Sequence, residues 1–180
     1  MSAPHAPGEM PPLVFRHPVE DDHHRLVGDI GRWFDGRRPT LLLGRAWFVH
    51  FASTSWIAEA RDGRIAAFLT GFISPDRPGE AVIHLAATNP QLRRLRIGTA
   101  IHETWLADVA VRGADRAVVA IPPEDKIAVL FYRSLGFDAE RSGAKPLWGV
   151  PAFADYDAEG VDRALFRRSV LPPTRRAPAT

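Results

Sequence analysis

The sequence has no cysteine, only two lysines and no long hydrophobic run among its 180 residues. Without thiols the chain forms no disulfide, no zinc site built on cysteine and no cysteine acyl-enzyme. No apolar run is long enough for a membrane-spanning helix, and the first residues lack the basic start and apolar segment of a signal peptide. We therefore expect a soluble, cytoplasmic protein with no membrane partner.

The charge is nearly balanced, but the positive charge is almost all arginine. The net charge is +2 and the isoelectric point is about 9.5, with Lys126 and Lys145 as the only lysines. Arginine binds phosphate through a planar, two-pronged set of donors. So small an excess does not indicate a nucleic-acid-binding protein. We expect no metal site either, because the adjacent His23 and His24 point to different sides of a helix.

Between two segments rich in Pro, Ala and Gly, strands and helices alternate. We expect flexible tails at 1–12 and 172–180 around one domain at 13–171. The predicted strands are 13–16, 55–60, 64–74, 81–88, 116–121, a strand opening at 136–137 and 161–171; the predicted helices are 19–34, 41–51, 98–112 and 124–135. Asp62-Gly63 between two apolar runs indicates a β-hairpin, and 141–160 is predicted as a long loop. The fold class is therefore mixed α/β, an antiparallel meander followed by a βαβ unit.

Residues 88–99 read Thr-Asn-Pro-Gln-Leu-Arg-Arg-Leu-Arg-Ile-Gly-Thr and connect a predicted strand to a predicted helix. A helix start offers unpaired main-chain N–H groups and the positive end of the helix dipole. Gly98 allows close approach of the backbone to a ligand, and Arg93, Arg94 and Arg96 add positive charge. The segment predicts a phosphate pocket, although a solvated basic helix start explains the same residues.

This segment resembles a motif of the GNAT superfamily of acyltransferases, Arg/Gln-x-x-Gly-x-Gly/Ala. Arg93 stands at its first position and Gly98 at its last. Arg96 replaces the middle glycine, and Arg94 replaces a glycine often found just before it.

A second segment strengthens the resemblance. Residues 125–137 are similar to the superfamily's Asn-x-x-Ala-x-x-x-Tyr-x-x-x-Gly-Phe, with Asp125 in place of the asparagine. The resemblance covers roughly 13–171 in outline and 80–140 in detail. It implies the GNAT fold, with a central sheet of about six to seven strands, helices on both faces and a splay between the fourth and fifth strands.

The resemblance implies an N-acetyltransferase that moves acetyl from acetyl-CoA to a primary amine by direct attack. No covalent enzyme intermediate is needed, which agrees with the lack of cysteine. Main-chain N–H groups near Ala87 and Thr88 are implied to polarise the thioester carbonyl. The residues implied in binding coenzyme A are Ala87, Thr88, Arg93, Arg94, Leu95, Arg96, Ile97, Gly98, Thr99, Asp125 and Ala128.

Two residues are candidates for proton transfer. Tyr132 matches the family tyrosine and is implied to protonate the departing sulfur, with a core aromatic as the alternative. His84, on the predicted strand 81–88, is the candidate base, with a hydrogen-bonded structural histidine as the alternative. Glu80 shares the face of His84 but lies at the entry of the strand.

The acceptor pocket is expected on the predicted helix 41–51 and the predicted loop 141–160. Trp47 and His50 lie a turn apart on the helix, and acidic groups such as Glu80 and Asp155 suit a cationic amine. Tyr156, beside Asp155 and Asp157, completes the candidate set. Core packing of Trp47 and a solvated turn at Asp155–Asp157 are the alternatives.

Three functions remain open at this point. The first is an acetyl-CoA-dependent N-acetyltransferase acting on a small-molecule or peptide amine. The second, suggested by the three arginines, is an acyltransferase whose donor is a carrier protein or an aminoacyl-tRNA. Only under this second function is a nucleic acid partner expected. The third is a non-catalytic acyl-CoA-binding sensor, suggested by the replaced glycines. The sequence names neither the acceptor nor the oligomeric state, although homodimers are common in the superfamily.

Overall fold

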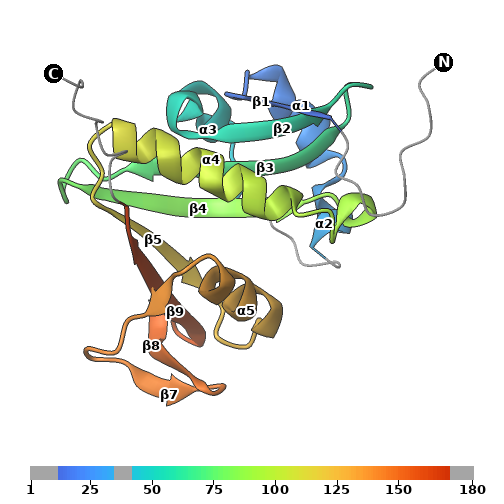
Figure 1. Cartoon of the computed structure of the whole chain (residues 1–180). Coiled ribbons are helices and arrows are strands. Elements are labelled where there is room, and N and C mark those ends of the chain that lie inside the picture. The colour runs from blue at the N-terminus through green and yellow to red at the C-terminus, as the bar shows by residue number, and fades with distance from the viewer. Residues whose placement is uncertain (1–11, 35–41, 171–180) are drawn as a thin grey trace, which may run out of the picture. The chain divides into compact units, whose positions relative to one another are not determined.

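The computed structural model describes residues 12–34 and 42–170. The chain divides into two compact units, Met1–Phe72 with His84–Asp108 and Ile73–Ile83 with Val109–Thr180 (Figure 1). Apart from Pro12, the predicted tails lie outside the described residues, as do Leu41 and Leu171 at the ends of a predicted helix and strand. No helix in the described part is long and apolar enough to cross a bilayer.

An antiparallel meander opens the first unit. It consists of β1 (Leu13–Arg16), β2 (Trp56–Ala60) and β3 (Ile65–Ile73), and β4 (Glu80–Thr88) follows in the strand order. The β2–β3 turn carries Gly63 at φ 82°, and the Asp62 carboxylate accepts a hydrogen bond from the Arg64 N–H at 3.1 Å. The hairpin predicted from Asp62-Gly63 is confirmed, because glycine adopts the positive φ that the turn requires.

The two long helices predicted in the first unit are wrong in extent. The span 19–34 is broken into α1 (Asp21–Val27) and α2 (Ile30–Trp33), and 41–51 contains only α3 (Ala46–Val49), followed by the 3₁₀ turn Ala52–Thr54. Gly28 and Gly44 lie where helix was predicted to continue, and glycine is a poor helix former. Packing then favours short helices that place their apolar residues in one core.

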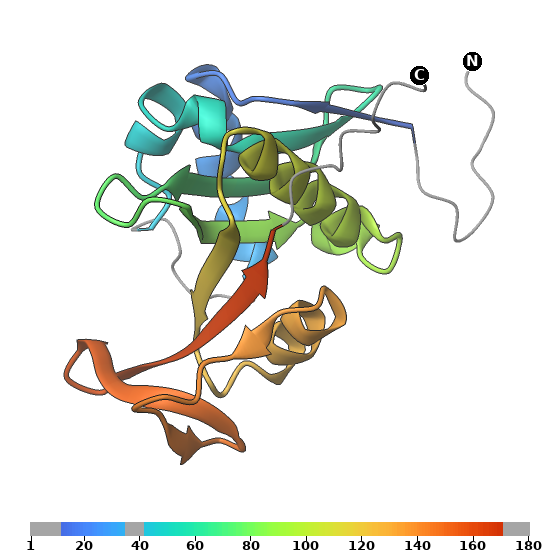
Figure 2. The same ribbon diagram turned by 60° about the vertical axis from the view of Figure 1, so that its left-hand side comes forward.

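That core lies against one face of β2 and β3. Its buried members come from α1, α2, α3, the segment just before α3 and the two strands; they are Leu26, Ile30, Trp33, Leu43, Phe48, Ile57, Ile65 and Phe68. Successive residues of a strand point to opposite faces. Trp56, next to Ile57, donates its indole N–H to Asp108 of α4 (Ile97–Val111) at 3.2 Å. Helix α4 therefore covers the opposite face of these strands, as Figures 1 and 2 show.

In the second unit the strand order is β4-β5-β9-β8-β7, with β6 also paired to β9 (Figure 2). Its elements are β5 (Arg116–Ile121), α5 (Lys126–Ser134), β6 (Asp138–Ala139), β7 (Lys145–Leu147), β8 (Val150–Ala158) and β9 (Val161–Ser169). The predicted loop at 141–160 is wrong, since most of it forms β7 and β8. Within the described residues the sheet has nine strands, more than predicted, because the exposed polar residues of β8 hide its alternation.

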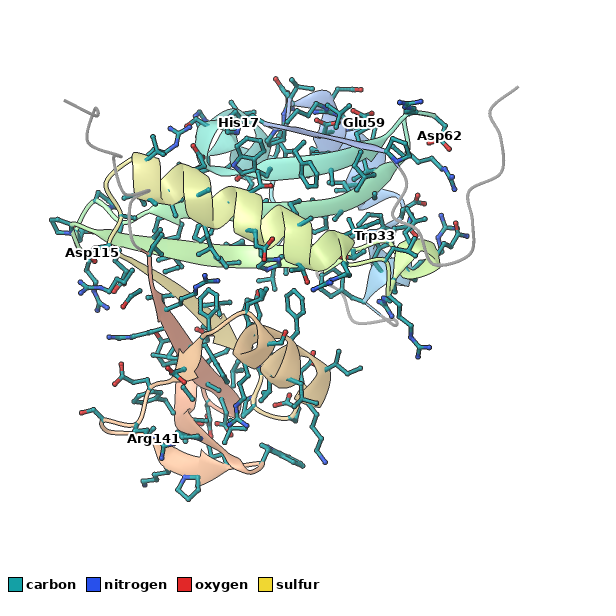
Figure 3. The ribbon with its side chains drawn as sticks, in the orientation of Figure 1. His17, Trp33, Glu59, Asp62, Asp115 and Arg141 are labelled. Carbon is teal, nitrogen blue, oxygen red and sulfur yellow. The ribbon has the colours of Figure 1, made fainter. Side chains whose placement is uncertain are left out.

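Strands β4 and β5 are parallel and joined through α4, which confirms the predicted βαβ unit. Their pairing runs from Glu80 opposite Arg116 to Ile83 opposite Val119, whereas β4 continues to Thr88. The pairing of β4 with β5 therefore ends at Ile83, before the end of β4. Asp115 (Figure 3) lies directly before β5 and next to Gly79. A Cβ on Gly79 would lie 2.8 Å from the Asp115 carboxylate, so a larger residue at position 79 would clash with it.

Candidate active site

The segment between β4 and α4 is anchored to the first unit at two points. At its start, Asn89 donates its N–H to the carbonyl of Ala66 at 2.8 Å and caps the 3₁₀ turn Pro90–Leu92 by accepting from the Gln91 N–H at 3.1 Å. Farther on, Arg93 donates from Nη2 to the carbonyl of Trp33 at 2.8 Å; Trp33 is labelled in Figure 3. The side chain at the first motif position therefore holds the loop in place.

The two arginines at glycine positions keep the backbone conformation of glycine. Arg94 has φ 67° and Arg96 has φ 59°, and both side chains are exposed. The left-handed conformation costs a non-glycine residue about 1–2 kcal/mol, so the fold maintains it against local preference. Left-handed residues of this kind occur in the main-chain concavities that bind anions. The segment thus keeps the positive φ values of a glycine-rich turn although arginines stand at two of its glycine positions.

Helix α4 begins directly after this turn. The Ala100 N–H donates to the carbonyl of Arg96 at 3.0 Å, and Ile97 is fully buried beneath the first turn. Leu95, Gly98 and Thr99 are half-buried. The main-chain N–H groups at this helix start and the positive end of its dipole are suited to a diphosphate, which is the group that coenzyme A presents here in the predicted site.

Sequence reasoning missed His102, which supports the same turn. Its Nδ1 lies 2.7 Å from the carbonyl oxygen of Gly98, which can only accept, so Nδ1 carries the proton. Burial lowers the pKa of His102 to about 4, and the hydrogen bond to Gly98 opposes that shift. The ring is therefore neutral at pH 7. The spacing of four residues from Gly98 on one predicted helix is the signal that could have identified it.

His84 and Trp47 come together from β4 and α3. Their rings stack with centroids 4.1 Å apart and an interplanar angle of 15°. The Nε2 atom of His84 lies 2.8 Å from the carbonyl oxygen of Leu42. Phe51 and Phe72 pack against Trp47 with centroids 4.8 and 6.1 Å away. His50 is exposed at the end of α3, Ala87 packs against the core of the first unit, and Thr88 ends β4.

In the second unit, Asp125 and Ala128 form one helix cap. The Asp125 carboxylate accepts a hydrogen bond from the Ala128 N–H at 3.0 Å, at the start of α5. Both residues were predicted to contact coenzyme A. Aspartate and the asparagine of the motif are equally good N-cap residues, because both side chains present an acceptor oxygen to the first turn.

Tyr132 is buried on α5, with its ring edge-to-face against Phe131 and Phe137 at 5.5 and 5.4 Å. Burial raises the pKa of the Tyr132 phenol. The hydroxyl therefore keeps its proton throughout the neutral range, as a proton donor must. The packing also shows that its ring belongs to the apolar interior, so the core role weighed from the sequence and the acid role are compatible.

The acidic residues predicted to hold an amine have partners within the second unit. Glu80 is buried and pairs with Arg116 at 3.1 Å and Arg77 at 3.6 Å. Asp155 lies in β8 with φ 52° and not in a loop, and its carboxylate accepts from the Gly160 N–H at 2.6 Å. Tyr156 is exposed on the same strand. Within 12–34 and 42–170, no three His, Asp or Glu side chains gather to hold a metal.

The sequence matches the acetyltransferase (GNAT) family over residues 20–137. It is also similar to L-2,4-diaminobutyric acid acetyltransferase of Nocardia farcinica, with 28% identity over 116 residues, 62% of this chain and 58% of the relative. The protein of the same name from Streptomyces anulatus is 34% identical over 64 residues, 36% of each chain. The matches thus span about three fifths and one third of the length of these relatives.

Solved structures share the fold. A GNAT-family protein from Desulfovibrio desulfuricans has a TM-score of 0.70 at 18% identity, covering 88% of this chain and 99% of that one. Diaminobutyrate acetyltransferase from Paenibacillus lautus, in complex with L-2,4-diaminobutyric acid and coenzyme A, has a TM-score of 0.62 at 21% identity, covering 89% and 96%. Given the family match and this shared fold, the chain belongs to the GNAT acetyltransferase family.

Proposed function

We propose that this protein is an N-acetyltransferase that transfers the acetyl group of acetyl-CoA to a primary amine of a small molecule. The observation that carries the proposal is the left-handed backbone at Arg94 and Arg96, which preserves the glycine-type turn before α4 in a GNAT chain. Main-chain N–H groups from that turn through Thr99 would hold the diphosphate. The residues present therefore fit coenzyme A.

Each chemical requirement of the reaction has a candidate group in this chain. Acetyl-CoA supplies the activated thioester. His84 is proposed to take a proton from the acceptor ammonium, which exposes the lone pair of the amine. Tyr132 is proposed to give its proton to the departing sulfur, and its raised pKa keeps that proton in place until then. The acylated nitrogen releases its second proton to solvent, and the phenolate takes a proton back from solvent. Main-chain N–H groups at Ala87 and Thr88 are proposed to polarise the carbonyl.

The acceptor we propose is a small diamino acid. Both curated relatives are named for L-2,4-diaminobutyric acid, and the Paenibacillus lautus structure contains it. In this chain the carboxylates of Glu80 and Asp155 already have partners. The candidate acceptor contact that remains is His50, which is exposed directly after α3.

The direct test is calorimetric titration with acetyl-CoA, followed by turnover with L-2,4-diaminobutyric acid and a panel of other diamines. Saturable binding and CoA release with a diamino acid are expected. Absence of acetyl-CoA binding contradicts the proposal. Binding without turnover over the whole panel identifies a sensor, and turnover only with a carrier-protein or aminoacyl-tRNA donor, strongly weakened by salt, identifies a polyanionic donor.

A further inference from the structure

We infer that Trp47 and the carbonyl group of Leu42 position His84 so that its Nδ1 atom is the proton acceptor. Trp47 then acts through His84 and does not bind the acceptor directly. The inference rests on the proposed function for the direction of proton transfer. The arrangement of the three residues stands on the geometry of the first unit.

The carbonyl of Leu42 selects the tautomer of His84. Nε2 lies 2.8 Å from that oxygen, and a carbonyl oxygen only accepts hydrogen bonds, so Nε2 carries the hydrogen. The neutral ring has one hydrogen, which leaves the lone pair on Nδ1. The carbonyl is itself fixed, because the next residue, Leu43, is fully buried in the core and its own carbonyl lies 3.1 Å from His23 Nε2.

Trp47 fixes the plane of the ring. The two rings are nearly parallel at 4.1 Å, and Trp47 is in turn held by Phe51 and Phe72. The indole face is electron-rich and attracts a cation more than a neutral ring. The carbonyl accepts from Nε2–H whether or not Nδ1 carries a proton, so the indole and the carbonyl hold the ring in one orientation before and after proton uptake.

No side-chain charge of the described residues forms an ion pair with His84. On α3 and its approach, Arg45 pairs with Glu20, and His50 is exposed. At the start of β4, Glu80 pairs with Arg116. A base that lacks a carboxylate partner depends on the carbonyl and the indole for its orientation.

The proton transfer follows from this orientation. The acceptor ammonium gives one proton to Nδ1, and the electron pair of that N–H bond becomes the lone pair of the amine. The hydrogen on Nε2 stays bonded to the Leu42 oxygen throughout. The imidazolium afterwards returns one proton to solvent, so His84 ends as it began.

The test uses Trp47→Leu, with Phe51→Leu as the matched control, since Phe51 contacts Trp47 in the same aromatic group. Nitrogen-15 NMR of the ligand-free protein reports the tautomer of His84, whether or not the protein turns over. We expect the Nε2–H form in the wild type and in Phe51→Leu, and a mixture of tautomers in Trp47→Leu. With the amine substrate, kcat of Trp47→Leu should fall about tenfold with KM nearly unchanged, and Trp47→Phe should restore most of it.

An Nδ1–H form in the wild type overturns the inference, as does an unchanged tautomer in Trp47→Leu. A raised KM at constant kcat also overturns it, because that pattern makes Trp47 an acceptor-binding residue. If the wild type binds no acetyl-CoA, the proposed function fails, whereas the tautomer experiment still decides whether Leu42 and Trp47 orient His84.

Discussion

Arg93 reaches across 60 residues of sequence to donate a hydrogen bond from its guanidinium to the carbonyl of Trp33, at 2.8 Å. Trp33 is buried at the end of α2, so this bond ties the loop before α4 to the core of the first unit. Arg93→Met keeps the length of the side chain and removes its donors. We expect a loss of about 1 kcal/mol of unfolding free energy and acetyl-CoA binding weakened several-fold by calorimetry. Arg93→Lys, which retains a donor, should lose less; equal binding by Arg93→Met would show that the loop is ordered without this bond.

Arg94 and Arg96 hold a conformation that glycine adopts without strain. Replacing either by glycine removes strain of about 1–2 kcal/mol but gives the unfolded chain more freedom, about 0.4–1 kcal/mol. Arg94→Gly should therefore unfold at an equal or higher urea concentration than the wild type, and Arg94→Val at a lower one. A rise in Kd for acetyl-CoA in the glycine variants, with a weaker dependence on salt, identifies the guanidinium groups as ligands. A fall in Kd shows that they obstruct the cradle.

Tyr132→Phe removes one hydroxyl from a buried ring. If Tyr132 is the acid, kcat should fall about a hundredfold or more while the KM values stay close to those of the wild type. Because burial raises the pKa of the phenol, its proton is retained as pH rises through the neutral range, and loss of that proton should produce no decline in kcat below about pH 10. Steady-state kinetics with circular dichroism as a check on folding measure both effects; unchanged kcat assigns Tyr132 to the core alone.

Asp125 caps α5 through the Ala128 N–H at 3.0 Å. Asp125→Ala should lower the unfolding free energy by about 1 kcal/mol, because one N–H of the first turn loses its acceptor. Asp125→Asn keeps the acceptor oxygen and should remain near the wild type in stability and in acetyl-CoA binding. Chemical denaturation compares the three proteins. Equal loss in both variants would mean that the negative charge, and not the cap, is what matters.

Asp22 lies fully buried at the centre of an ion-pair network with Arg16 and Arg25, at 2.6 Å from each, and Glu59 (Figure 3) completes it. Burial opposes ionisation of Asp22, but hydrogen bonds from Arg16 and from the Val19 N–H, together with both positive charges, lower its pKa overall. The folded pKa thus lies below the unfolded value near 3.9, so the carboxylate stabilises the fold above about pH 4, and this stabilisation is lost as pH falls through the folded pKa.

Asp22→Asn should therefore lower the free energy of unfolding by about 3–5 kcal/mol at pH 7. Its stability should also decline less steeply between about pH 5 and 2. Urea unfolding across that range measures both quantities. Asp21→Asn, at the exposed neighbour in α1, serves as the control and should follow the wild type. If the unfolding free energy of Asp22→Asn depends on pH as steeply as that of the wild type, groups other than Asp22 cause the acid sensitivity.

Much of the second half of the fold was predictable, because its signals are short-range. The bounds of β5 agree with the apolar run at 116–121, and α4 and α5 agree within two residues with the predicted helices. Apolar periodicity, a breaking Pro-Pro pair and a capping aspartate all act within a few residues. The predictions failed at β7 and β8, where Trp148 in the turn between the two strands and Asp155 in β8 take positive φ values and exposed polar side chains obscure the strand pattern.

The sequence by itself determined the family, the order of most strands and helices, and the location of the turn before α4, because these follow from local patterns and from two motifs with fixed spacing. Only the tertiary structure decided that Arg93 is a tether, that Arg94 and Arg96 keep a glycine backbone, and that His84 faces a carbonyl and an indole. The physical reason is that the sign of a φ angle, the tautomer of a histidine and the partner of a hydrogen bond depend on groups from distant parts of the chain. No local sequence pattern encodes these contacts.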